Sequence, residues 1–91
     1  MSSDFVNENV LTFSDDFLKK VNHPRRLQII EQIGLNNKLR FTDIKKEHEF
    51  SSGNLSHHLK ELEGLIIQNI DKTYSLTNEG GKIYHFFPST Y

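Results

Sequence analysis

The chain has 91 residues, of which 35% are hydrophobic, and its formal net charge is −1. This length supplies apolar material for one core and therefore one domain, and the lack of cysteine excludes disulfides, thiolate zinc sites and thiol redox sensing. No stretch approaches the roughly 20 apolar residues that span a bilayer, and the first residues lack the basic and apolar segments of a secretory signal, so we expect a cytoplasmic protein without membrane contact.

Two helices are predicted in the first third of the chain. Ser14 suits the N-cap of the first helix, because its hydroxyl accepts a free backbone N–H, and Asp15 and Asp16 follow at the positive helix end. Pro24 suits the first turn of the second helix, which we expect to end at Gly34, a residue that favours a left-handed C-cap. The predicted core residues of the second helix are Leu27, Ile30 and Ile33, with Ile29 at their flank.

A short strand and two more helices follow. Residues 39–41 alternate as a short strand does, and Thr42 is expected to cap a brief helix to about Glu49, with Ile44 as its main core residue. This helix is too short to be stable alone, so it must pack across the next one, predicted for residues 52–63. The longer helix has a stripe of leucines at i, i+4 and i+7, which we expect to be buried: Leu55, Leu59 and Leu62.

Beyond these helices the hydrophobic periodicity changes from helical to extended. Residues 65–70 are rich in β-branched side chains, and residues 73–76 are the expected partner strand. Asp71 and Lys72 between them predict a tight hairpin turn.

Thr77 is expected to cap a last helix that ends near Phe87. The order of elements is then helix, helix, short strand, helix, helix, strand, strand and helix. Two short helices joined by a tight turn and followed by a hairpin form a winged helix-turn-helix. We therefore predict a mainly α fold with a small β-hairpin over residues 13–87, with an N-terminal extension at residues 1–12 and a tail at residues 88–91.

The exposed face of the helix at residues 52–63 indicates a function. Outside the leucine stripe its side chains are short or hydrogen-bonding, and they are concentrated in the first two turns. A recognition helix enters the DNA major groove with its N-terminal residues at the base edges, where small residues allow close approach and Asn pairs bidentately with adenine. The predicted DNA-binding residues of this helix are Ser52, Gly53, Asn54, Ser56, His57, His58 and Lys60.

Other basic residues are candidates for phosphate contacts. The net charge of −1 argues against nucleic-acid binding when taken alone, but the charges are unevenly placed along the chain. Lys45 and Lys46 face outward from the brief helix, either toward phosphates or as an ordinary solvated face. The remaining predicted DNA-binding residues are Thr42, Lys45, Lys46 and Lys72.

Three segments resemble the motifs of one group of regulators. Residues 22–30 are similar to the HPxRLxIL opening of arsenic-repressor-type (ArsR) winged-helix regulators. Residues 51–63 are similar to the LSxGNLSxHLxxLE recognition helix of the branch near these and the antibiotic-resistance-repressor (MarR) regulators, and residues 74–80 match their YxLTxxG. The resemblance covers residues 13–87. It implies a transcription regulator, usually a homodimer, that uses Ser52, Gly53, Asn54, Ser56 and His57 at the groove.

The chain departs from that group in three features. Wings of the group usually have a longer basic loop than the one predicted here. Gly81 follows Gly80 where a helix former is expected, which costs up to ~1 kcal/mol of helix stability relative to Ala. The cysteine and paired acid and histidine metal sensors of the arsenic-repressor group are absent, so metal sensing is not carried over.

Catalytic and metal sites are not expected. His57 and His58 are adjacent, and adjacent helical positions point about 100° apart, so the two cannot chelate one ion together. Asp15 and Asp16 could be read as a catalytic carboxylate pair, but we expect them to compensate the positive end of the helix dipole. The sequence has no nucleophile beside a base and no phosphate-binding glycine loop. We therefore expect no enzyme activity, cofactor, metal or small-molecule ligand.

The aromatic residues near the C-terminus predict a partner. They supply more apolar surface than one short helix buries, and exposed aromatic surface usually marks an interface. Pairing with apolar residues of the N-terminal extension would form a homodimer, whereas the alternative is that the tail folds back on its own core. The predicted dimerisation residues are Phe5, Val10, Leu11, Tyr84 and Phe87.

The sequence thus predicts a homodimeric regulator of transcription that binds double-stranded DNA in a sequence-specific manner. The alternative is a winged-helix protein-interaction module in a transcription or other multi-subunit assembly, favoured by the near-neutral charge, the short hairpin and the aromatic tail. Binding of single-stranded nucleic acid is not supported, because the aromatic residues are terminal and do not line a strand platform.

Overall fold

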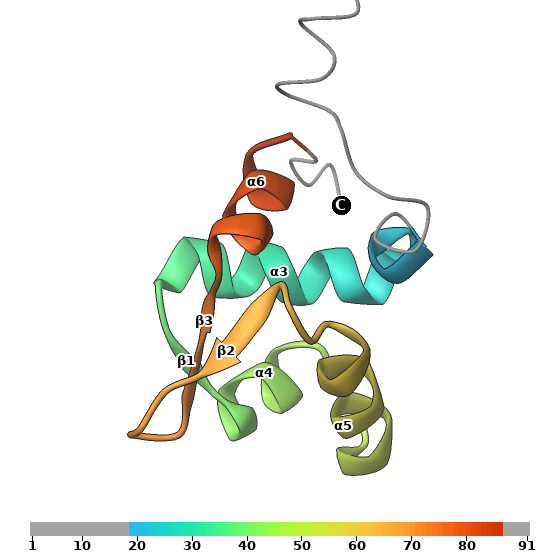
Figure 1. The fold of residues 1–91 in the computed structure, drawn as a ribbon. Coiled ribbons are helices and arrows are strands. Elements are labelled where there is room, and N and C mark those ends of the chain that lie inside the picture. Colours follow the sequence, from blue (N-terminus) through green and yellow to red (C-terminus); the bar gives the residue numbers. More distant parts are fainter. Residues whose placement is uncertain (1–18, 87–91) are drawn as a thin grey trace, which may run out of the picture.

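The computed structural model describes residues 19–86. The predicted first helix falls largely outside them; residues 19–21 form a helical turn ahead of the elements in Figure 1. The helices are α3 (Pro24–Asn36), α4 (Phe41–Glu47), α5 (Ser52–Glu61) and α6 (Asn78–Phe86), and the strands are β1 (Leu39–Arg40), β2 (Ile66–Gln68) and β3 (Thr73–Leu76). None of the helices in this part of the chain has the length and apolar character to cross a membrane.

The three strands form one small antiparallel sheet in the order β1-β3-β2. The predicted hairpin is confirmed, because Ile66 of β2 pairs with Leu76 of β3. The short strand β1 adds to the other edge of β3, where Leu39 pairs with Tyr74. The fold class is therefore mainly helical with a small antiparallel sheet.

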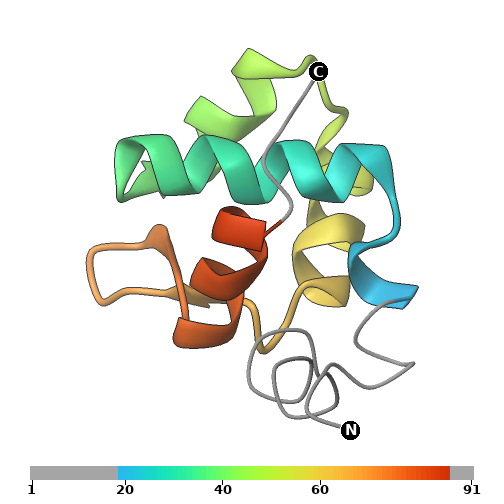
Figure 2. The same cartoon turned by 90° about the horizontal axis from the view of Figure 1, so that it is seen from above.

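Helix α3 is the central element of the molecule. It packs against α6 and β3, and α4 lies on the side of α3 away from α6 (Figures 1 and 2). This placement corrects two predictions. Ile29, expected at the flank, is fully buried because α3 is covered on more than one side. Leu27, expected in the core, is only partly buried and packs against the core from its edge. The residues predicted as core in α4 and in the leucine stripe of α5 are buried as expected: Ile44, Leu55, Leu59 and Leu62.

The end of α3 differs from the prediction. The helix continues past Gly34 to Asn36, and the left-handed residue after it is Asn37, with φ 69°. Gly34 lies beneath the ring of Tyr84, where a Cβ would come within 2.6 Å of a ring carbon. The glycine therefore allows α6 to approach α3 and does not serve as a C-cap.

Helix α4 begins and ends at residues other than those predicted, whereas α5 begins at Ser52 as predicted and ends earlier than expected. Helix α4 begins at Phe41, before Thr42, and the Asp43 carboxylate accepts a hydrogen bond from the Arg40 backbone N–H at 3.1 Å. Helix α5 is capped by Ser51, whose hydroxyl accepts from the backbone N–H of Asn54 at 3.1 Å, and it ends at Glu61.

The hairpin turn is longer than predicted. The backbone N–H of Lys72 donates to the Asn69 carbonyl at 2.9 Å, and the Asn69 N–H donates to the Thr73 carbonyl at 2.7 Å. Strand β2 accordingly ends at Gln68, and Ile70 belongs to the turn together with Asp71 and Lys72. Lys72 has φ 72°, the left-handed conformation that often closes a three-residue hairpin loop.

The predicted cap of the last helix is confirmed. The Thr77 hydroxyl accepts a hydrogen bond from the backbone N–H of Gly80 at 3.1 Å. Gly80 is buried, and a Cβ there would overlap the carbonyl oxygen of Leu65. Gly81 faces open space instead. The first glycine thus brings α6 against the loop before β2, whereas the second has no packing role.

Candidate nucleic-acid interface

The first two turns of α5 form an exposed polar surface. Burial of the leucine stripe turns the opposite side of the helix to solvent, since residues on one helical face recur at i, i+4 and i+7. Six of the predicted DNA-binding residues are exposed on this side of α5: Ser52, Gly53, Asn54, Ser56, His57 and Lys60.

Gly53 has no packing reason to be a glycine. It lies in the first turn of α5 and has a negative φ, and a Cβ built on it meets no atom within 4 Å. Glycine lowers helix stability relative to alanine by ~1 kcal/mol, so this position bears a cost that the fold does not require. The backbone N–H groups of a first helical turn have no intrahelical partner, and at this glycine they are open to an approaching acceptor.

His58 lies apart from this surface. It is half-buried on the side of α5 that faces α3, and its Nδ1 atom accepts a hydrogen bond from Nε of Arg26 at 3.2 Å. The ring of His23 packs edge-on at 4.9 Å between centroids, and the ring of Phe50 at 5.7 Å. Burial lowers the pKa of His58, and the positive charges of His23 and Arg26 lower it further. Of the two adjacent histidines, His57 is exposed and His58 is half-buried.

The turn between α4 and α5 is held by Arg25. Its guanidinium lies 4.0 Å from the ring centroid of Phe50, which is itself buried, and it donates to the carbonyl of His48 at 3.0 Å. Arg25 thus ties the N-terminal end of α3 to the turn between α4 and α5. The sequence patterns gave no role to Arg25 or Arg26. The one sign of such a role was their position directly after Pro24, at the start of the predicted helix.

The residues predicted on α4 lie on its outer side. Thr42 and Lys46 are exposed, whereas Lys45 is half-buried. Within the described residues, neither Lys45 nor Lys46 takes part in an ion pair, whereas Arg40 pairs with Asp43 at 3.6 Å. Lys46 is therefore the better placed of the two lysines for a contact with an external anion.

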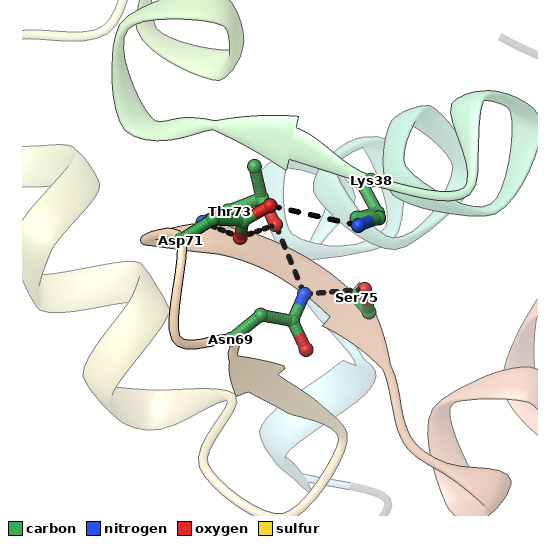
Figure 3. A network of polar contacts seen from close by, with 5 residues as sticks. All are labelled: Lys38, Asn69, Asp71, Thr73 and Ser75. Carbon is green, nitrogen blue, oxygen red and sulfur yellow. Dashed lines mark hydrogen bonds and ion pairs between the residues drawn. The ribbon is translucent and has the colours of Figure 1, made fainter.

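A polar network holds the hairpin turn (Figure 3). One carboxylate oxygen of Asp71 accepts from the Thr73 hydroxyl at 2.6 Å and from its backbone N–H at 3.1 Å, and the other pairs with Lys38 at 3.5 Å. The Asn69 amide donates to the hydroxyls of Thr73 at 3.0 Å and of Ser75 at 2.8 Å. The hydrogen bonds from Thr73 hold the pKa of Asp71 below its usual value, with a smaller effect of Lys38.

An open groove of about 430 Å³ separates α5 from the hairpin. Ser56 and Lys60 line it from α5, and Gln68 lines it from β2. Leu59, Ile66, Tyr74 and Phe41 complete the lining, together with Glu63. A mixed apolar and polar channel thus runs beside the exposed face of α5.

The predicted dimerisation residues are described only in part. Phe5, Val10, Leu11 and Phe87 lie outside the described residues. Tyr84 is half-buried, and its ring lies against Gly34 of α3. Phe86 is 45% exposed at the end of α6.

Residues 19–86 contain no group of three or more histidine, aspartate and glutamate side chains arranged to hold a metal ion.

Comparison with known proteins gives one match. A family model described as a domain of unknown function (DUF7347) matches residues 14–87. No curated protein and no solved structure matches the chain. The match covers well over half of the chain and includes all of the elements described above.

Proposed function

This chain belongs to the DUF7347 family, and we propose from the geometry of its residues that it is a sequence-specific, double-stranded DNA-binding regulator of transcription that acts as a homodimer. In this proposal the domain is a winged helix-turn-helix. Helices α4 and α5 with the turn at residues 48–51 are the helix-turn-helix, α5 is the recognition helix, and the β2–β3 hairpin is the wing.

The observation that carries the proposal is the N-terminal half of α5. Its exposed side chains are small or hydrogen-bonding, and Gly53 leaves the first turn bare without any benefit to packing. A helix that enters the major groove needs this combination, because its first turns must come within hydrogen-bonding distance of base edges. Asn54 and His57 are the side chains best placed for those contacts.

Unpaired positive charge is present on α4, on α5 and on the hairpin. Within the described residues, Lys46, Lys60 and Lys72 are exposed and take part in no ion pair, whereas Lys38 and Lys82 are paired with Asp71 and Glu79. A protein with a net charge of −1 can therefore still present unpaired positive charge beside α5.

The test is selection of duplexes from a random pool at ~150 mM salt, with the mass of the complex measured alongside. We expect one enriched palindromic site that binds two chains, with half-sites about one helical turn, roughly 34 Å, apart. An enriched site that binds a single chain would support DNA binding but would exclude the proposed homodimer. Failure to retain any duplex even at ~50 mM salt would overturn the proposal, because non-specific binding is strongest at low salt.

A protein-interaction module in a multi-subunit assembly is the second candidate. It is favoured by large apolar side chains in the open: Leu35 is 65% exposed and Phe86 45%. This candidate requires that no duplex is retained at low salt and that substitution of these two residues abolishes binding of a defined partner.

A further inference from the structure

Two consecutive arginines at the start of α3 contact different parts of the proposed helix-turn-helix. Arg25 holds the turn through the carbonyl of His48 and the ring of Phe50. Arg26 contacts α5 itself, through the hydrogen bond from its Nε atom to Nδ1 of His58 at 3.2 Å. The proposed recognition helix is thus joined to α3 by a polar contact in addition to the apolar core that the helices share.

Among the acceptors of these contacts, only the imidazole of His58 changes its hydrogen-bonding capacity with pH. A backbone carbonyl such as that of His48 accepts at any pH, whereas a protonated imidazole donates from both of its nitrogens. Because a guanidinium only donates, a proton on Nδ1 of His58 sets two positively charged donors against each other at Arg26. The contact that joins α5 to α3 therefore forms only while His58 is neutral.

The groups around His58 do not compensate a positive charge on its ring. Burial lowers the pKa of His58, and the positive charge of His23 lowers it further. Glu61 and Glu63, which follow it along the chain, and Glu49 of the turn take part in no ion pair within residues 19–86. The charged and titratable groups that surround the contact are Lys20 and His23 ahead of α3, Arg25 and Arg26 of α3, His48 of the turn, and His57 of α5.

We propose that the contact between Arg26 and His58 is a pH-sensitive joint, in which protonation of His58 releases α5 from α3 and thereby lowers the affinity of the chain for DNA. This inference rests on the proposed function of α5. The two adjacent histidines then act in opposite directions. His57 lies on the exposed face, where a proton adds a positive charge that strengthens binding to phosphates. His58 lies toward α3, where a proton breaks a contact that positions the helix.

The direction of the pH dependence follows from proton linkage. DNA binds the form in which Arg26 holds α5, and this form requires a neutral His58. The free chain takes up the proton more readily once the contact is open, so acidification favours the unbound state. Because the pKa of His58 is lowered from 6.5, affinity should fall as the pH decreases below that value. One linked proton limits the fall to about tenfold per pH unit.

The test measures the affinity of the full chain for its selected duplex at constant salt, between about pH 7.5 and about pH 5.5. His57→Asn is the reference protein, because it removes the titrating group of the exposed face and retains His58. We expect its affinity to fall about tenfold over this range. His58→Asn keeps an acceptor near the position of Nδ1 and does not titrate, so its affinity should not fall.

Another histidine provides the matched control. His85→Asn removes an exposed ring of α6, and it should have the same pH profile as the wild type.

A second measurement follows the joint without DNA. In the amide NMR spectrum of the free wild-type chain, the signals of α5 and of the N-terminal end of α3 should move together as the ring of His58 is protonated. The signals of the β2–β3 hairpin should stay in place. In His58→Asn the joint movement should be absent, and its spectrum at neutral pH reports whether this variant is folded. If it is not, the wild-type titration alone decides whether protonation of His58 moves α5.

The outcomes separate the inference from the proposed function. An affinity of His57→Asn that stays constant or rises on acidification would overturn the joint and leave α5 as the recognition helix. An equal fall in affinity for His58→Asn would assign the pH dependence to another group and would overturn it as well. Signals of α5 that do not move as His58 titrates would have the same consequence. A chain that retains no duplex at any pH would remove the proposed function, and this inference with it.

Discussion

Arg26 and His58 are joined by a hydrogen bond from Nε to Nδ1 of 3.2 Å, which links the N-terminal end of α3 to α5 across 32 positions of sequence. The bond requires an imidazole with an unprotonated Nδ1, because a guanidinium only donates. The second contact of Arg26, from its Nη1 atom to the carbonyl of Lys20 at 3.2 Å, fixes the guanidinium in place. This hydrogen bond between α3 and α5 therefore requires a neutral His58.

The first prediction concerns pH. The pKa of His58 is lowered from the ordinary 6.5 in the folded chain, so near and below that pH the unfolded chain binds more protons than the folded one. The free energy of unfolding should consequently fall as the pH is lowered through 6.5. Urea denaturation at a series of pH values measures this dependence.

Variants at the two adjacent histidines provide the control. Asn can place an acceptor near the position of Nδ1 and does not titrate, so His58→Asn should have a weaker pH dependence than the wild type. His57→Asn removes only one of the smaller contributions to the lowered pKa of His58 and should retain most of the dependence. Equal pH profiles for the wild type and His58→Asn would show that His58 is not the titrating group.

The second prediction concerns two neighbouring glycines of α6. Gly81→Ala should raise the free energy of unfolding by up to ~1 kcal/mol, because the site is open and alanine favours the helix. Gly80→Ala should lower it by ~1–3 kcal/mol, because the new methyl group overlaps the Leu65 carbonyl. Chemical denaturation of the pair measures both effects, and changes of the same sign would contradict the described packing of α6.

The third prediction concerns the contact between α3 and α6. Gly34→Ala should destabilise the protein by ~1–3 kcal/mol through its clash with the Tyr84 ring. In a Tyr84→Ala background the same substitution should cost less, since the ring is gone. A double-mutant cycle measures the coupling, and additive effects of the two substitutions would exclude a direct clash.

The fourth prediction separates base recognition from phosphate contact. Asn54→Ala should reduce discrimination at one base pair by ~1–3 kcal/mol, because a bidentate contact to adenine is lost. Lys46→Ala should weaken all duplexes alike and lower the salt slope by about 0.9. Titration of matched and single-mismatch duplexes at several salt concentrations distinguishes the two patterns.

Lys82→Ala is the matched control for these titrations, because Lys82 lies on α6 and pairs with Glu79. It should leave affinity, discrimination and salt slope unchanged. If Asn54→Ala and Lys46→Ala behaved like Lys82→Ala, the assignment of α4 and α5 to DNA would be wrong.

Local pattern was sufficient to predict several features of the fold. Leu55, Leu59 and Leu62 recur at helical spacing, and their burial follows from that spacing whatever the rest of the chain does. The cap at Thr77 was equally predictable, because a hydroxyl and the backbone N–H it accepts from lie within one turn.

Helix ends were predicted less well because local preference competes with tertiary contact. Gly34 has the conformational freedom of a C-cap, yet the chain uses it as the place where the Tyr84 ring approaches α3. Asn37 takes the left-handed position instead. Glycine suits both a helix C-cap and a close contact between helices, and only the packing of α6 shows that Gly34 serves the second.

The exposed polar face of α5 was determined by the sequence alone, since helical periodicity divides the side chains of one helix into two faces. The tertiary structure decided which of its histidines stays on that face: His57 is exposed, and His58 turns toward Arg26 and His23. It also decided that Ile70 stands at the hairpin tip. Both depend on contacts and hydrogen bonds that form only when distant segments pack, and these are not encoded in the spacing of neighbouring residues.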